Sequence, residues 1–141
     1  MKLSISRTDV WAATIDDRPG AVADKLVALA AAGANLGFII ARRMPEHGGS
    51  GVLFVTPIKG AKQVKAADEA GFQRTESLHS VRAEGSDKPG VGARMTRAIA
   101  AAGINMRGLS AAAIGKRSVT YLALDSAADA AKVAGILKKL A

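Results

Sequence analysis

Apolar positions along the chain follow two spacings, one typical of strands and one typical of helices, and these alternate in a regular order. A short run of strand-forming side chains is followed by apolar residues at i, i+4 and i+7, and then by two further apolar runs. The spacings predict five elements in the first half, in the order strand, helix, strand, strand, helix: residues 10–15, the segment between Pro19 and Gly33, 36–41, 52–56 and 62–70. The first helix is expected to bury Val22, Ala23, Leu26, Leu29 and Ala30.

The second half repeats this order. Its first helix carries Val91, Met95 and Ile99 on one face. Strands are predicted over residues 104–113 and 118–124, and a final helix over 127–140. The two halves therefore predict the same structural unit.

Sequence identity supports a repeat with an offset of 70 residues. Across residues 10–36 and 80–106, 11 of 27 positions are identical at that offset. The informative matches are the Asp-x-Pro-Gly segments at 17–20 and 87–90, and the Gly-x-Asn segments that follow each helix. Since twice 70 is 140, the chain consists almost entirely of two copies of one unit.

The two copies do not have the same number of predicted strands at their ends. Residues 72–82 are long enough for two strands in series, whereas the second copy lacks a closing strand after its last helix. Residues 1–6 are surplus before the first copy and occupy, at the offset of 70, the place of 71–76. We therefore expect the N-terminal segment to complete the sheet of the second unit, because proteins avoid an open sheet edge.

These motifs in duplicate resemble the ACT domain, and the resemblance covers practically the whole chain. It is closest to small free-standing bacterial proteins made of two ACT units. It implies an α+β fold of two ferredoxin-like βαββαβ units in tandem, with antiparallel sheets. The expected domains are residues 1–77 and 78–141, the second one receiving an edge strand from residues 1–7.

The resemblance also implies that an amino acid or a similar small effector binds between neighbouring units, against the loop before the first helix and the start of the second strand. A helix N-terminus offers free N–H groups to a carboxylate, and Asp or Asn oxygens can accept from an α-ammonium group. The candidate ligand-binding residues are Asp17, Arg18, Pro19, Gly20, Asn35, Leu36, Asp87, Lys88, Pro89, Gly90, Asn105 and Met106. Two structural alternatives stay open, since Asp before Pro-Gly can simply cap a helix and Asn after Gly can simply form a turn.

The net positive charge raises the question of nucleic-acid binding but does not favour it. The net charge is +8, of which residues 71–141 contribute +6, from 11 basic and 5 acidic side chains. No basic run exceeds two residues, and Trp11 and Tyr121 are the only Trp and Tyr, so bases have little to stack on. A solvated basic surface explains the charge better than nucleic-acid binding.

The remaining chemistry argues against an enzyme. The chain has no cysteine and two histidines, His47 and His79, without metal-site spacing. No nucleophile, base and orienting acid can be assembled from the sequence, and the glycine-rich segment 48–51 lacks the Gly-Lys-Ser/Thr of a phosphate loop. We therefore expect no catalytic residues, no metal and no cofactor.

We accordingly expect a cytoplasmic, non-catalytic regulatory module that binds an amino acid and acts through its association, as a homodimer or with a partner protein. No signal peptide or membrane span is expected, because glycines and Asn35 interrupt the longest apolar stretch. The alternative is a ligand-free structural or adaptor module that dimerises and binds a partner protein. A nucleic-acid binder that uses the basic second half is a third, less favoured, hypothesis.

Overall fold

The computed structural model describes residues 2–140, and for residues 75–78 it describes the backbone alone. Met1 and Ala141, the outer limits of the expected domains, lie outside the described residues. The strands are β1 (Leu3–Asp16), β2 (Phe38–Arg43), β3 (Ser50–Thr56), β4 (Gln73–Ser86), β5 (Met106–Ile114) and β6 (Arg117–Leu124). The helices are α1 (Ala21–Ala31), α2 (Gly60–Glu69), α3 (Val91–Ala101) and α4 (Ala127–Leu140).

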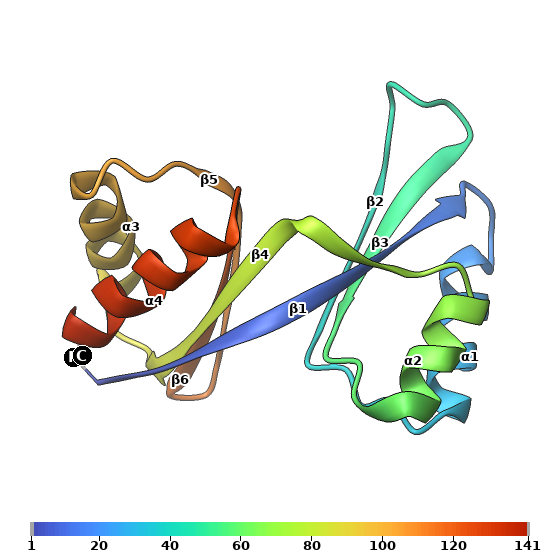
Figure 1. Ribbon diagram of the computed structural model, residues 1–141, viewed down its shortest axis with the longest axis horizontal. Helices are drawn as coiled ribbons and strands as arrows, with labels where there is room; N and C mark the ends of the chain where they lie inside the picture. The colour runs from blue at the N-terminus through green and yellow to red at the C-terminus, as the bar shows by residue number, and fades with distance from the viewer. Residues whose placement is uncertain (1, 141) are drawn as a thin grey trace. The chain divides into compact units, whose positions relative to one another are not determined.

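Contacts along the chain divide it into two compact units (Figure 1). The first unit is Asp9–Thr75, and the second unit is Met1–Thr8 together with Glu76–Ala141. The strands follow the order β2-β3-β1-β4-β6-β5, and β2 and β5 are therefore edge strands. The boundary expected after residue 77, as a limit between independent domains, stays a prediction.

The first unit packs α1 and α2 on one face of its sheet (Figure 1). β3 lies between β2 and β1 and is antiparallel to both. The buried core between sheet and helices is formed by Trp11, Ala13, Leu29, Leu53, Val55, Ala67 and Phe72. Ala23 and Ala30 of α1 are exposed, contrary to expectation, because the buried stripe runs through Ala21 and Leu29.

The second unit has the same arrangement, with α3 and α4 over one face of its sheet (Figure 1). β6 lies between β4 and β5 and is antiparallel to both. Its core consists of Val81, Ala83, Met95, Ile99, Leu122, Leu124, Ala130, Val133, Ala134 and Leu137. This confirms the predicted α+β fold with antiparallel ferredoxin-like units.

The N-terminal strand completes the sheet of the second unit, as predicted. Leu3 and Ile5 pack against the core of that unit. A Cβ added to Gly85 of β4 would lie 2.6 Å from the Lys2 carbonyl oxygen and 2.9 Å from Leu3 Cδ2. Glycine at position 85 therefore allows the two strands to approach closely. The two strands expected in series over residues 72–82 form one continuous strand, β4.

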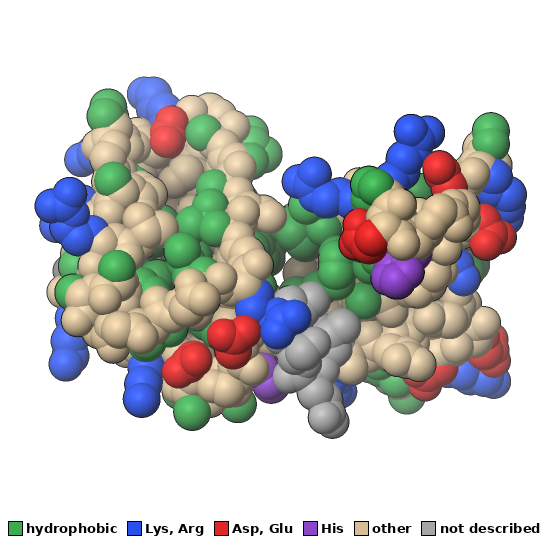
Figure 2. Space-filling model, turned by 90° about the horizontal axis from the view of Figure 1, so that it is seen from above, with side chains coloured by type: hydrophobic (Ala, Val, Ile, Leu, Met, Phe, Trp, Pro, Cys, Tyr) green, Lys and Arg blue, Asp and Glu red, His purple; other side chains and the backbone are tan. Residues whose placement is uncertain are grey.

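Basic side chains are spread over the surface of both units, in agreement with a solvated basic surface. On the face shown in Figure 2, Lys and Arg side chains lie apart from one another around each unit. Among residues 2–140, no helix has the length and apolar character needed to span a membrane.

Candidate functional site

Each Asp-x-Pro-Gly turn leads into a helix that has unpaired N–H groups in its first turn. Gly20 and Gly90 precede α1 and α3 with φ of 86° and 88°, a conformation that favours glycine. Neither helix has a side-chain cap. Within the described chain, the N–H groups of residues 22, 23, 92 and 93 have no hydrogen-bond partner, as is usual for a first helical turn without a cap. Each turn therefore presents unpaired donors and the positive end of a helix dipole.

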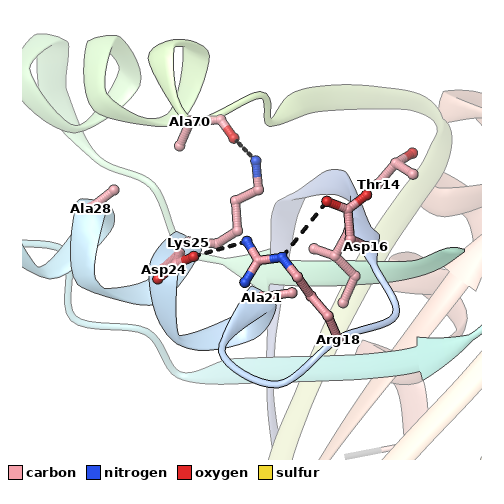
Figure 3. Close-up of a pocket in the computed structure, with 9 residues that line it drawn as sticks. Thr14, Asp16, Arg18, Ala21, Asp24, Lys25, Ala28 and Ala70 are labelled. Carbon is pink, nitrogen blue, oxygen red and sulfur yellow. Dashed lines mark hydrogen bonds and ion pairs between the residues drawn. The ribbon is translucent and has the colours of Figure 1, made fainter. Parts of the chain in front are cut away.

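In the first unit, charged side chains of the protein itself surround this helix end. A cavity of about 480 Å³ is lined by Thr14, Ile15, Asp16, Arg18, Ala21, Asp24, Lys25, Ala28 and Ala70. Figure 3 shows the Arg18 guanidinium between two carboxylates, with its nitrogens 3.8 Å from Asp16 and 3.1 Å from Asp24. The Lys25 amine donates to the carbonyl oxygen of Ala70, at the end of α2. The charges lining this cavity are thus largely paired with one another.

A smaller cavity of the first unit lies between the turn and β2. It measures about 180 Å³, and Asp17, Arg18, Val22 and Arg43 are among its lining residues. Arg43 Nε donates to the Asp17 carboxylate at 3.1 Å. The carboxylate expected to accept from a ligand is therefore already paired with an arginine.

The second unit has a cavity of about 240 Å³ at the corresponding place. It is lined by Asp87, Lys88, Gly90, Val91, Gly92, Ala111, Ala112, Ala113, Ser118 and Thr120. No described residue pairs with the side chains of Asp87 or Lys88. Small side chains, two hydroxyls and a helix N-terminus thus form this cavity, together with one side chain of each charge that has no described partner.

Strand register makes the two sites comparable residue by residue. In the first unit Gly51 lies across from Ile15 on one side and Arg43 on the other. In the second unit Ser118 lies across from Gly85 and Ala113. One rung further along the sheet, Leu53 of the first unit corresponds to Thr120 of the second, each between two alanines. At three of these four positions the second unit therefore has a smaller side chain than the first, on the face beneath the helices.

Asp17 and Arg18 of the first turn and Asp87, Lys88 and Gly90 of the second line these cavities. The other predicted site residues line none of the three: Pro19, Gly20, Pro89, Asn35, Leu36, Asn105 and Met106.

Asn35 and Asn105 are exposed and follow α1 and α3, whose 11 residues separate them from the turns by about 16 Å of helix. Leu36 and Met106 pack against the cores. A single unit does not bring its turn and its asparagine together.

Several cavity residues were not singled out from the sequence: Asp24, Lys25, Arg43, Gly92, Ala111, Ala112, Ala113, Ser118 and Thr120. A comparison of the two copies could have found Gly92, which replaces Val22 at the offset of 70. Ser118 and Thr120 correspond to Gly51 and Leu53 at an offset of 67, because the turn between β5 and β6 is shorter. A fixed offset therefore misses them.

A polar cluster lies on the other face of the sheet of the second unit. Arg82 donates to Glu84 at 2.8 Å and to the Tyr121 hydroxyl at 3.2 Å. Hydrogen bonding to Arg82, and its charge, lower the pKa of Glu84 from its ordinary value. Arg117 adds an ion pair to Glu84 at 3.5 Å. In the part of the chain that the structure describes, no group of three or more His, Asp or Glu side chains could hold a metal ion.

Comparison with known proteins supports the fold. No protein-family model matches the chain, and no curated protein matches it by sequence. A solved structure of a protein from Bacteroides thetaiotaomicron is 15% identical, with 95% of this chain and 90% of that chain covered and a TM-score of 0.78.

The regulatory subunit of aspartate kinase from Thermus thermophilus, in its ligand-free form, is 19% identical, with 96% and 95% covered and a TM-score of 0.63. The corresponding subunit from Thermus flavus is 18% identical, with 99% and 96% covered and a TM-score of 0.60. The fold is therefore ACT-like, and at these identities the similarity concerns the fold alone.

Proposed function

We propose that this chain is a non-catalytic regulatory module that binds a small amino acid at its Pro-Gly turns. The observation that carries the proposal is the combination of a helix N-terminus with unpaired N–H groups and an aspartate that lines the same cavity. The regulatory subunits of aspartate kinase with the same fold favour a regulatory role over a catalytic one.

The two charges of an α-amino acid match this arrangement. Its carboxylate accepts from the free N–H groups at the start of α3, where the helix dipole also favours negative charge. Its ammonium group donates to the Asp87 carboxylate, which no described residue neutralises. Lys88 adds a second positive charge near the carboxylate.

A second copy of the chain supplies the asparagine in this proposal. β5 is an edge strand, and residues 108–114 along it carry no charge, although edge strands usually carry charges that prevent pairing. If two copies pair antiparallel along β5, the start of one strand lies opposite the end of the other. The partner's Asn105 then approaches the cavity walls at Ala111 and Ala113. A bound ligand would thereby stabilise the pair. The fraction of paired chains would then rise with the ligand concentration, and this is how the module would respond to its ligand.

A thermal-shift screen of the twenty amino acids, followed by calorimetry on the full chain, tests the proposal. A true ligand at a hundred times its Kd should stabilise the protein by about 2.7 kcal/mol. Asn105→Ala should reduce the binding free energy by about 1–3 kcal/mol, with little change in the free energy of unfolding, since its side chain is exposed. If none of the twenty produces a shift, the proposal fails.

The ligand-free adaptor is the second candidate function, because two large apolar side chains on β5 are exposed, Leu109 by 43% and Ile114 by 78%. Such a strand suits pairing with another protein as well as with a second copy. A pair of constant strength with and without all twenty amino acids would favour this candidate.

A further inference from the structure

We propose that only the second unit binds the ligand, and that its cavity selects a small amino acid with a polar side chain, whereas the first unit retains the same turn as a structural element. This inference rests on the proposed function. It follows from side chains that differ between the two equivalent cavities.

In the first unit, the charged side chains that a zwitterion would contact are already paired. Arg43 Nε holds the Asp17 carboxylate at 3.1 Å, so an ammonium group would have to displace a guanidinium. Arg18, next to the helix start, is held by Asp24 and also donates to the Pro19 carbonyl oxygen at 3.2 Å. Val22 occupies the position of Gly92 in the second unit and narrows the approach to the helix amides.

In the second unit, each of these obstacles is removed. Ala113 replaces Arg43, and Asp87 is left without a cation among the described residues. Gly92 replaces Val22, and a Cβ added there would meet no atom within 4 Å. The cavity volume of about 240 Å³ corresponds to about eight water molecules. The helix amides are therefore accessible to a small molecule.

The burial of Thr120 and its hydroxyl without a protein partner are the observations that indicate a ligand. This threonine is 5% exposed, on the face of the sheet that carries the core residues Leu122 and Leu124, and it stands where the first unit has the fully buried Leu53. Its hydroxyl has no hydrogen-bond partner among the described residues. No described side-chain oxygen is both fully enclosed and unpaired, so this hydroxyl is reached from the cavity that it lines. The hydroxyl is therefore available to donate and accept hydrogen bonds with a molecule in that cavity.

The positions of the polar groups define the ligand class. The helix amides and Asp87 take the carboxylate and ammonium groups, which every amino acid carries. Thr120 and Ser118 lie on adjacent rungs of the sheet beneath the helices and can each donate and accept a hydrogen bond. Ala111 and Ala113 add only methyl groups. The site therefore favours a short side chain that ends in a hydroxyl or amide.

Isothermal titration of the full chain with the amino acids that pass the thermal-shift screen tests the inference. We expect one site per chain and a preference for small polar amino acids over alanine. Thr120→Val, which removes the hydroxyl at constant shape, should weaken binding about tenfold or more, and Thr120→Ser should restore it. Gly92→Val should abolish binding, because its side chain fills the cavity.

Two controls address general effects of substitution. Gly135→Val changes an exposed helix glycine in the same unit, also with open space around it, and should leave affinity unchanged. Arg43→Ala alters the first unit alone and should also leave it unchanged. Two equal sites per chain, or full affinity in both Thr120→Val and Gly92→Val, would overturn the inference while leaving the proposed function standing. Absence of binding by any amino acid would instead reject the proposed function itself.

Discussion

Thr120 occupies the place on the sheet of the second unit that Leu53 occupies in the first unit. Each is paired on both sides with alanines of the neighbouring strands. Leu53 is fully buried and Thr120 is 5% exposed. The same rung thus completes a core in one unit and contributes a hydroxyl to a cavity in the other.

This difference predicts opposite effects on stability. Leu53→Thr should lower the free energy of unfolding by about 3 kcal/mol, because it removes buried apolar volume and places a hydroxyl in the core. Thr120→Val should raise it by about 0.5–1 kcal/mol, since an unpaired hydroxyl is removed at constant shape. Urea denaturation of both variants measures these changes. A loss above 1 kcal/mol in Thr120→Val would mean that the hydroxyl has a structural partner.

The N-terminal strand should stabilise the second unit. Deletion of residues 1–6 removes Leu3 and Ile5 from its core and uncovers the edge of β4 beside Gly85. Hydrogen exchange should therefore increase in residues 79–86 and in α3 and α4 at least as much as in the first unit. Replacement of the exposed Lys2 by Ala serves as the control and should change little. Faster exchange restricted to residues 9–70 would contradict this role.

The Asp17–Arg43 ion pair should contribute little to folding. The side chains are 37% and 81% exposed, and exposed pairs contribute about 0.2–1 kcal/mol. Arg43→Ala should therefore lower the free energy of unfolding by less than about 1 kcal/mol, and the loss should shrink at high salt. Asp17→Asn should give a similar value, and a double-mutant cycle isolates the pair.

Stability should depend on pH through Glu84. Its pKa is lowered from the ordinary value of 4.5 by Arg82, first through a hydrogen bond and then through charge. The folded state therefore favours the ionised form, and the resulting stability is present above pH 4.5 and is lost as the pH falls through the lower folded pKa. Glu84→Gln lacks this contribution. The difference between wild type and variant should be full at pH 7 and disappear in strong acid; a constant difference across this range would refute the assignment.

Association should depend on β5. Leu109→Lys combined with Ile114→Lys places two charges on the exposed edge strand and should convert the pair that we propose along β5 into single chains at micromolar concentration, as measured by sedimentation. Val27→Lys is the matched control, since Val27 is an equally apolar side chain, 68% exposed, on α1. If Val27→Lys dissociates the pair and the β5 variant does not, the interface lies elsewhere.

Much of the fold could be predicted from local signals. Asp-x-Pro-Gly at 17–20 and 87–90 marks the end of a strand and the start of a helix, and Gly20 and Gly90 have the positive φ that such a turn requires. The surplus of residues 1–6 over one repeat correctly predicted the strand beside β4. Strand limits were less accurate: β2 begins at Phe38, two residues later than predicted.

The sequence by itself determined the repeat, the order of elements and the two turns, because these depend on neighbouring residues and on apolar spacing. Only the tertiary structure decided which side chains line the cavity at each turn. Thr120, Gly92 and Asp87 come from a strand, a helix and a turn, and they meet only when α3 packs on the sheet. The shorter turn between β5 and β6 also shifts the equivalence of the copies from 70 to 67 residues, so the exchange of Leu53 for Thr120 becomes visible only through strand register.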